Sequence, residues 1–272
     1  YQGTVAPTQQ EKGKAFRALH EGDPFVIPNP WDAGSAKMLA GTGFKALATT
    51  SSGLAFALGR PDGTVTLDEI VGHVDALREA TDLPVSVDLE HGYGPTAADV
   101  ERAITSVAAA GAVGGSIEDY DRDEGRLYTL GEAVDRVSAA VAAARALDFP
   151  FTLTARAENH LRGNPDLDDT IARLLAFREA GADVLYAPRL TGVGEIEAIC
   201  TAVERPVNVL AFPGLGLSFD EIVGAGAQRV SVGGWLALTA VKAAADAAER
   251  IFEAGDFSSL SAPSRIGEWL GS

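Results

Sequence analysis

Eight short apolar runs recur along the chain, each bounded by glycine, proline or polar residues. The runs are almost continuously apolar instead of alternating, which is typical of parallel strands covered by helices on both faces. They predict strands over residues 25–28, 46–50, 84–88, 114–118, 151–156, 183–187, 206–211 and 229–233.

Segments with helical periodicity separate these runs and predict helices over residues 33–40, 67–80, 97–110, 131–147, 167–180, 194–203, 218–225 and 236–254. Thr66 and Ser218 stand at N-cap positions with acidic residues behind them. Glycines are expected just past helix ends, at Gly41, Gly111, Gly181 and Gly226. Eight strand-then-helix units predict an α/β fold, a (β/α)8 TIM-type barrel, because an open doubly wound sheet usually has fewer strands.

The chain of 272 residues has the right length for one such barrel, since α/β barrels run to about 250 residues as a single domain. We expect residues 1–255 to form the barrel and residues 256–272 to form a C-terminal helical appendage. A short amphipathic piece at residues 266–270 is suited to docking on a neighbouring subunit. No low-complexity linker divides the chain.

The charge balance limits the partners. There are 38 acidic and 22 basic side chains, a net charge of −16, so no nucleic-acid binding is expected, because phosphates are bound by clusters of Lys and Arg. No apolar run reaches about 18 residues and no apolar signal core is seen near residue 1, so neither membrane spanning nor export is expected. Cys200 is the only cysteine, which excludes an internal disulfide and favours a cytoplasmic location.

Candidate catalytic residues follow from the fold, because the active site of such a barrel lies at the C-terminal ends of its strands. Asp88 and Glu90 stand two residues apart at one strand end, and Glu118 ends the next strand. Three converging carboxylates repel one another unless a cation neutralises them, and oxygen ligands favour Mg²⁺ or Mn²⁺ over Zn²⁺. The alternative is pairing with Arg156, whose guanidinium needs either these acids or a substrate carboxylate as its partner.

Other strand ends offer groups for an anionic substrate. The run Ser51-Ser52-Gly53-Leu54 provides hydroxyl and backbone N–H groups, although it is also an ordinary turn sequence. Asn208, in the seventh predicted strand, is a further candidate for substrate binding. Gly233-Gly234 leads into a helix where many barrels hold a phosphate, but a tight turn is the simpler interpretation.

Together these residues resemble the isocitrate lyase and phosphoenolpyruvate mutase superfamily over nearly the whole chain. The resemblance begins at Pro28-Asn29-Pro30-Trp31-Asp32-Ala33 and includes Ser52-Gly53-Leu54, Asp62, Glu118-Asp119 and Arg156. The run Asp88-Leu89-Glu90-His91-Gly92-Tyr93-Gly94 is similar to the family's Asp-x-Asp-x-Gly-(Phe/Tyr)-Gly, with Glu90 in place of the second aspartate.

The resemblance implies a Mg²⁺-dependent barrel that makes or breaks a C–C or P–C bond of a small 2-oxo or 2-hydroxy carboxylate through a pyruvate-like enolate. It implies a homo-oligomer, a dimer or tetramer, in which the last barrel helix is exchanged between subunits. The site it implies has Asp88, Glu90 and Glu118 around the metal, Ser52, Gly53, Leu54 and Arg156 on the substrate, and catalytic roles for Asp62, Arg156 and Glu118.

The chain departs from its relatives in the loop after the fourth strand. The family's isocitrate and methylisocitrate lyases carry Lys-(Lys/Arg)-Cys-Gly-His there, whereas residues 119–130 hold no Cys, Lys or His. The phosphonopyruvate-handling members place an asparagine in this lid and a histidine after strand six, where this chain has Ala187-Pro188. We expect a C–C lyase-type enzyme. The alternatives are mutase-like or hydrolase activity, a catalytically lapsed carboxylate-binding barrel, and a barrel for a phosphorylated substrate.

Overall fold

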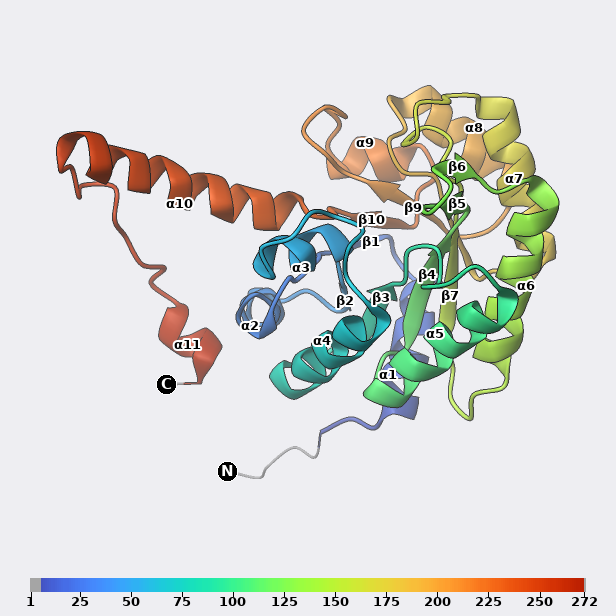
Figure 1. The fold of residues 1–272 in the computed structure, drawn as a ribbon, viewed down its shortest axis with the longest axis horizontal. Helices are drawn as coiled ribbons and strands as arrows, with labels where there is room; N and C mark the ends of the chain where they lie inside the picture. The colour runs from blue at the N-terminus through green and yellow to red at the C-terminus, as the bar shows by residue number, and fades with distance from the viewer. Residues whose placement is uncertain (1–5, 272) are drawn as a thin grey trace.

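The computed structural model describes residues 6–271, and its centre is a parallel eight-stranded sheet curled into a barrel (Figure 1). The strand order is β1-β10-β9-β8-β7-β4-β3-β2. The two ends of this order meet where the Ala48 N–H donates to the Pro28 carbonyl at 3.1 Å. The Asn29 amide also donates to the carbonyls of Ala48 and Thr49. The barrel is therefore nearly closed, which confirms the predicted (β/α)8 architecture.

All eight predicted strands are present, and several are shorter than predicted because their last residues turn into loops. The strands are β1 (Phe25–Ile27), β2 (Leu47–Ala48), β3 (Val85–Asp88), β4 (Gly114–Glu118), β7 (Thr152–Arg156), β8 (Val184–Tyr186), β9 (Val207–Leu210) and β10 (Arg229–Ser231). The parallel register places Glu118 of β4 directly beside Arg156 of β7. Two sequence-distant candidates thus become neighbours at one end of the barrel.

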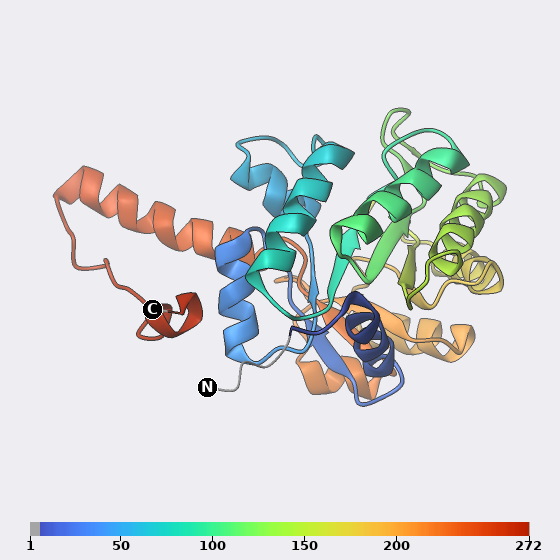
Figure 2. The ribbon, with the colours of Figure 1, turned by 90° about the horizontal axis from the view of Figure 1, so that it is seen from below.

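All eight predicted helices are present, and all of them except α10 lie around the outside of the barrel (Figure 2). They are α2 (Ala33–Thr42), α4 (Leu67–Ala80), α5 (Ala97–Ala110), α6 (Leu130–Arg145), α7 (Leu167–Glu179), α8 (Val193–Val203), α9 (Phe219–Gly224) and α10 (Trp235–Ala254). Thr66 and Ser218 form capping boxes, as predicted. The prediction for Gly41 is wrong, because α2 continues to Thr42 and ends at Gly43 with φ 110°. Gly41 instead leaves room for the Trp269 ring, which a Cβ there would approach to 2.5 Å.

Three elements were not predicted: helix α1 (Gln9–Leu19), helix α3 (Ser51–Ala57) and a hairpin of β5 (Tyr120–Asp121) and β6 (Arg126–Leu127). Helix α1 is mostly polar, and its buried Phe16 packs at the N-terminal end of the barrel, where a Cβ on Gly114 would lie 2.7 Å from its ring. The capping box between Thr8 and Glu11 is the sequence signal for this helix.

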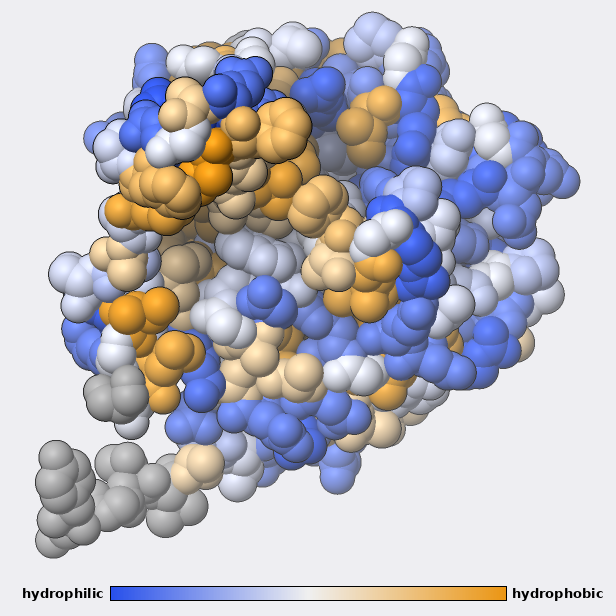
Figure 3. Space-filling model, turned by 60° about the vertical axis from the view of Figure 1, so that its left-hand side comes forward, coloured by the Kyte–Doolittle hydropathy of each residue, from blue (hydrophilic) through white to orange (hydrophobic). Residues whose placement is uncertain are grey.

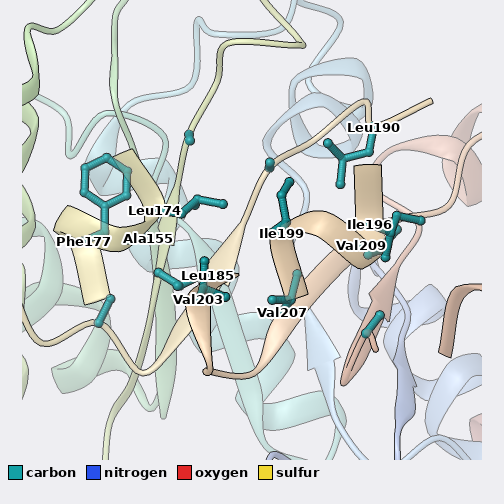
Figure 4. Packing of buried hydrophobic residues seen from close by; sticks show 14 of the residues in the cluster. Ala155, Leu174, Phe177, Leu185, Leu190, Ile196, Ile199, Val203, Val207 and Val209 are labelled. Carbon is teal, nitrogen blue, oxygen red and sulfur yellow. The ribbon is translucent and has the colours of Figure 1, made fainter. Parts of the chain in front are cut away.

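The largest hydrophobic cluster lies between strands β7–β9 and the helices that cover them. Leu174 and Phe177 of α7 and Ile199 of α8 are fully buried against Leu185 and Val207 of the sheet (Figure 4). Burial of a large apolar side chain contributes about 1.5–3 kcal/mol, so this layer fixes the strands that carry the site.

Helix α10 projects away from the barrel, and the chain then returns so that α11 (Ile266–Leu270) packs against α2 (Figure 1). Ala237 is the only buried residue of α10, whereas Leu238 is 45% and Phe252 92% exposed. Apolar side chains gather on this side of the molecule (Figure 3). Among residues 6–271, α10 included, no helix combines the length and apolarity that crossing a membrane requires.

Candidate active site

Asp88, the last residue of β3, has both carboxylate oxygens engaged. Oδ1 accepts a hydrogen bond from Arg156 Nη1 at 2.7 Å, and Oδ2 accepts one from Ser51 Oγ at 2.9 Å. Burial by itself raises the pKa of Asp88, but the charge of Arg156 and the Ser51 hydrogen bonds bring the pKa below its ordinary value. Asp88 is therefore a permanent anion at the mouth of the barrel.

Arg156 joins three carboxylates. Its Nη2 lies 3.0 Å from Glu118 Oε2 and 2.7 Å from Glu158 Oε1, in addition to the Nη1 contact with Asp88. The guanidinium also lies 5.3 Å from the centre of the Tyr186 ring. Burial opposes the charge of Arg156, but the three carboxylates raise its pKa well above the ordinary value. The side chain is thus a fixed cation with a defined orientation.

A second arginine, Arg122, reaches the acids from the β5–β6 hairpin. Its Nε lies 3.4 Å from Glu90 Oε2 and 3.3 Å from Glu118 Oε1. The guanidinium rests on the backbone at Gly63, where a Cβ would collide with Arg122 Nη1. The hairpin therefore closes over the carboxylates in this structure, as a lid does.

Arg162 is the third cation of the site. Its Nη2 lies 3.0 Å from Glu158 Oε2 and 3.4 Å from Glu118 Oε1, and its guanidinium stacks 3.8 Å from the centre of the Tyr120 ring. The stacking ties the start of the hairpin to the segment after β7.

Glu90 and Glu118 each have a buried carboxylate oxygen that makes no hydrogen bond to the described part of the chain. Glu90 Oε1 has no hydrogen-bond partner among residues 6–271, and Glu118 Oε2 approaches Arg156 without hydrogen-bonding geometry. Burial raises the pKa of Glu90 to about 7, with Arg122 opposing the shift, and burial followed by the charge of Glu158 raises the pKa of Glu118. Glu90 also holds a left-handed backbone, φ 48°, of the kind that clusters at functional sites.

The charges of the site suit a divalent cation. Three guanidinium groups face five carboxylates when Asp62 is included, which leaves two negative charges uncompensated if all are ionised. Across residues 6–271, no three His, Cys, Asp or Glu side chains converge closely enough to coordinate a metal directly. Mg²⁺ keeps several of its waters in proteins, so this arrangement fits a largely water-mediated ion.

The structure places the remaining sequence candidates around this cluster. Asp62 lies in the exposed loop after α3, with its Oδ1 3.4 Å from Ser51 Oγ. Ser52 shares a 3.0 Å hydrogen bond with Thr50 Oγ1, and the Gly53 N–H donates to the same Thr50 oxygen at 3.3 Å. Leu54 points into the hydrophobic core.

Asn208 lies inside the barrel and lines the same cavity as Asp88 and Arg156. Its amide is already engaged, because it donates to Ser231 Oγ at 2.9 Å and accepts from Arg229 Nε at 2.8 Å. The Gly233 N–H donates to Asn29 Oδ1 at 2.8 Å, and the Val232 N–H does so at 3.0 Å. The glycine turn after β10 therefore does not offer these N–H groups to a phosphate.

Sequence reasoning did not select Glu158, Arg122 and Arg162. Glu158 stands two residues after Arg156 at the same strand end, and this spacing was a usable signal. The two arginines lie in loops, where no periodicity places a side chain. Cys200 lies in α8, packed beside Gly226, and burial raises the pKa of its thiol to about 11. The Cys200 thiol therefore does not replace the cysteine that the lyases of the family carry in the loop after the fourth strand.

Comparison with known proteins gives the family. The family model described as phosphoenolpyruvate phosphomutase matches residues 16–252. The chain belongs to the phosphoenolpyruvate mutase and isocitrate lyase superfamily. Within this superfamily it is 32% identical over 212 residues to the 2-methylisocitrate lyase of Escherichia coli K12, covering 74% of this chain and 70% of that protein.

Two further superfamily members are similar over most of their length. The oxaloacetate decarboxylase of Rhodopseudomonas palustris TIE-1 is 32% identical over 222 residues, 78% of this chain and 75% of that protein. The crystal structure of a candidate lyase/mutase from Burkholderia cenocepacia J2315 is 51% identical with a TM-score of 0.94, covering 97% of this chain and 98% of that one. The superfamily contains C–C lyases and mutases, in agreement with the class expected from the residues.

Proposed function

We propose that this protein is a divalent-metal-dependent C–C lyase that acts on a small 2-oxo or 2-hydroxy di- or tricarboxylate through a pyruvate-like enolate. The observation that carries the proposal is the position of Arg156, fixed among Asp88, Glu118 and Glu158 at the barrel mouth. Beside it stand the incompletely satisfied carboxylates of Glu90 and Glu118. A fixed guanidinium next to excess negative charge suits an anionic substrate that arrives together with a cation.

The superfamily implies a divalent metal. We propose Mg²⁺ or Mn²⁺, held by Asp88, Glu90 and Glu118, mainly through water. Such an ion, when bound, acts as a Lewis acid that stabilises negative charge on an enolate oxygen. Glu90 is one methylene longer than the family's aspartate, which brings its carboxylate nearer to Arg122 on the lid.

The chain's own groups then orient the substrate. We propose that Arg156 binds a substrate carboxylate, that Ser52 and the backbone of Gly53 and Leu54 contact its oxygens, and that Asp62 lies near the reacting group. In a 2-oxo substrate, the electron pair of the breaking C–C bond passes toward the adjacent carbonyl and forms the enolate, which then takes a proton at carbon. The lid holds no thiol or imidazole. Cleavage that releases CO₂ needs no acid for the leaving fragment, and water supplies the proton for the enolate.

A second candidate is a barrel that binds a carboxylate without turnover. The contacts of Arg122 with Glu90 and Glu118 favour it, because this guanidinium already neutralises part of the charge that a metal would meet. Mutase-like and hydrolase activities remain alternatives within the superfamily. They have less support, since the lid has no asparagine.

We also propose a homo-oligomer, a dimer or tetramer, in which α10 of one subunit packs on its neighbour. The exposed apolar side chains of α10 and of the segment after it support this arrangement, with Phe252 92% and Leu260 60% exposed. In this proposal residues 1–255 are the catalytic domain and residues 256–272 the appendage. A cytoplasmic location is proposed from the single cysteine.

A substrate panel tests the proposed function. The protein is assayed with Mg²⁺ against oxaloacetate, 2-methylisocitrate and related acids, with release of the 2-oxo acid product followed by coupled reduction. We expect turnover that EDTA abolishes and that falls at least about 100-fold in Arg156→Ala. The matched control is Arg102→Ala, which removes an exposed pair with Asp99 and should leave turnover unchanged. Oxalate binding without turnover of any acid would favour the second candidate.

A further inference from the structure

A buried arginine stands inside the barrel beneath the candidate active site. Arg229 is the first residue of β10 and is only 5% exposed. Its Nε donates to Asn208 Oδ1 at 2.8 Å, its Nη2 donates to Thr154 Oγ1 at 3.0 Å, and its Nη1 lies 3.2 Å from His20 Nε2. All three partners are neutral groups.

No carboxylate of residues 6–271 forms an ion pair with Arg229, in contrast to Arg156 at the mouth of the barrel, which contacts three. His20 does not share the charge, because burial and the neighbouring guanidinium lower its pKa to about 3 and keep the ring neutral. The nearby Tyr186 is also neutral, since burial raises its pKa to about 12. A buried cation without a counter-ion is strongly unfavourable.

A cavity of about 70 Å³ adjoins this arginine. Arg229, Asn208, Ser231 and Tyr186 line its wall, and the cavity continues to Asp88 and Arg156. Thr154, which bonds Arg229, precedes Arg156 by two residues on β7, so the guanidinium of Arg229 lies about 7 Å deeper along the strand. The space holds a few water molecules or one small anion.

The guanidinium has donors to spare. It carries five N–H groups, and the contacts with Asn208, Thr154 and His20 use three of them. Asp88, at the other end of the cavity, is already bonded to Arg156 and Ser51 and makes no ion pair with Arg229. The uncompensated positive charge and the two remaining N–H groups of Arg229 both favour an anion that accepts hydrogen bonds.

We propose that the barrel interior binds one small monovalent anion against Arg229, either a halide or a carboxylate group of formate size. This site is separate from the Asp88, Glu90 and Glu118 cluster. Its occupation by an inorganic ion does not depend on the proposed activity, whereas its occupation by a substrate carboxylate rests on that activity. An inorganic ion and a substrate carboxylate that reaches into the barrel have the same chemistry here: each carries one negative charge and accepts hydrogen bonds.

The test compares thermal midpoints at constant ionic strength, with gluconate, which is too large for the cavity, replaced stepwise by chloride, bromide or formate. We expect a saturable rise of about 3–6 °C at ten times Kd in the unmodified protein. Arg229→Met, which removes the buried charge and keeps an apolar chain, should lose the rise. Arg102→Met, on the surface, should keep it.

Crystals soaked in bromide give a readout that does not depend on any variant. We expect an anomalous peak between Arg229, Asn208 and Ser231. If the bromide peak persists when oxalate and Mg²⁺ occupy the mouth of the barrel, the ligand of the Arg229 site is an inorganic anion. If a dicarboxylate displaces the bromide, the ligand is a substrate carboxylate. Equal midpoints in gluconate and chloride would overturn the proposal, and a peak without a saturable shift would count as an adventitious ion only and overturn it as well.

Discussion

Replacement of Arg156 by methionine is the sharpest perturbation of the carboxylate cluster, because it removes the charge and keeps the length of the side chain. In the structure the guanidinium lies 2.7 Å from Asp88, 3.0 Å from Glu118 and 2.7 Å from Glu158, and the side chain is only 11% exposed. Removing one partner of a buried ion pair typically destabilises by about 3–5 kcal/mol. A domain with an ordinary stability of about 5–15 kcal/mol remains folded after such a loss.

The loss should depend on pH in a defined direction. Without Arg156, the pKa of Glu118 in the folded state lies further above its unfolded value, and the pKa of Asp88 is no longer lowered by the guanidinium, so the folded state binds more protons. The free energy of unfolding of Arg156→Met therefore falls as pH rises through the folded-state pKa values. We expect a loss of about 3–5 kcal/mol that is larger at pH 8 than at pH 6, because protonation of the carboxylates left without Arg156 relieves part of the loss at the lower pH.

Urea unfolding followed by circular dichroism at both pH values measures this difference. Arg102→Met is the control, since its exposed pair with Asp99 should contribute less than about 1 kcal/mol at either pH. A loss below about 1 kcal/mol at pH 8 in Arg156→Met, or a loss at pH 8 no larger than that at pH 6, would show that Arg156 does not compensate the buried carboxylates.

Three further predictions concern other parts of the molecule. Gly53→Ala should destabilise the protein by about 1–3 kcal/mol in thermal unfolding, because the new Cβ would lie 2.7 Å from Thr50 Cγ2. Gly72→Ala is the control and should be neutral or stabilising, because nothing lies within 4 Å of its Cβ. Equal effects of the two substitutions would contradict the predicted clash at Gly53. His20 has a folded pKa of about 3 against 6.5 unfolded, so it should cost about 2 kcal/mol of stability between pH 7 and pH 5, and His20→Gln should flatten that part of the pH profile. The double variant Leu238→Glu, Phe252→Glu should lower the mass in sedimentation toward the 28.2 kDa monomer; a wild-type monomer would exclude the proposed oligomer.

The strands and their helices could be predicted from sequence because burial on both faces leaves continuous apolar runs such as residues 114–118. Helix α1 was missed because it is mostly polar and its one buried aromatic, Phe16, is held by a tertiary contact; its capping box is the one local signal for it. Gly41 shows the same limit at a helix end: its role is set by Trp269, which lies far away in the sequence. Local patterns carry no record of such tertiary contacts.

In the candidate site, the residues at strand ends could be predicted from the sequence, and the residues in loops could not. Asp88, Glu118 and Arg156 stand at strand ends, so the fold itself brings them together, and the register between β4 and β7 makes two of them neighbours. Arg122 and Arg162 reach the site from loops, and their positions depend on contacts with Glu90 and Tyr120 that sequence spacing does not encode. Arg229 is part of a predicted strand, but its lack of a counter-ion is visible only in three dimensions.

A metal-dependent enolate site is tested by the thermal midpoint with excess Mg²⁺, first alone and then with oxalate, a planar dianion shaped like a pyruvate enolate. At about 100 times Kd a ligand adds roughly 2.7 kcal/mol, which corresponds to a rise of about 5–10 °C for a domain of this size. We expect such a rise with Mg²⁺ and oxalate together, and a much smaller one with oxalate in the presence of EDTA. No rise with both at saturating concentrations would contradict a metal-dependent enolate site at Asp88, Glu90 and Glu118.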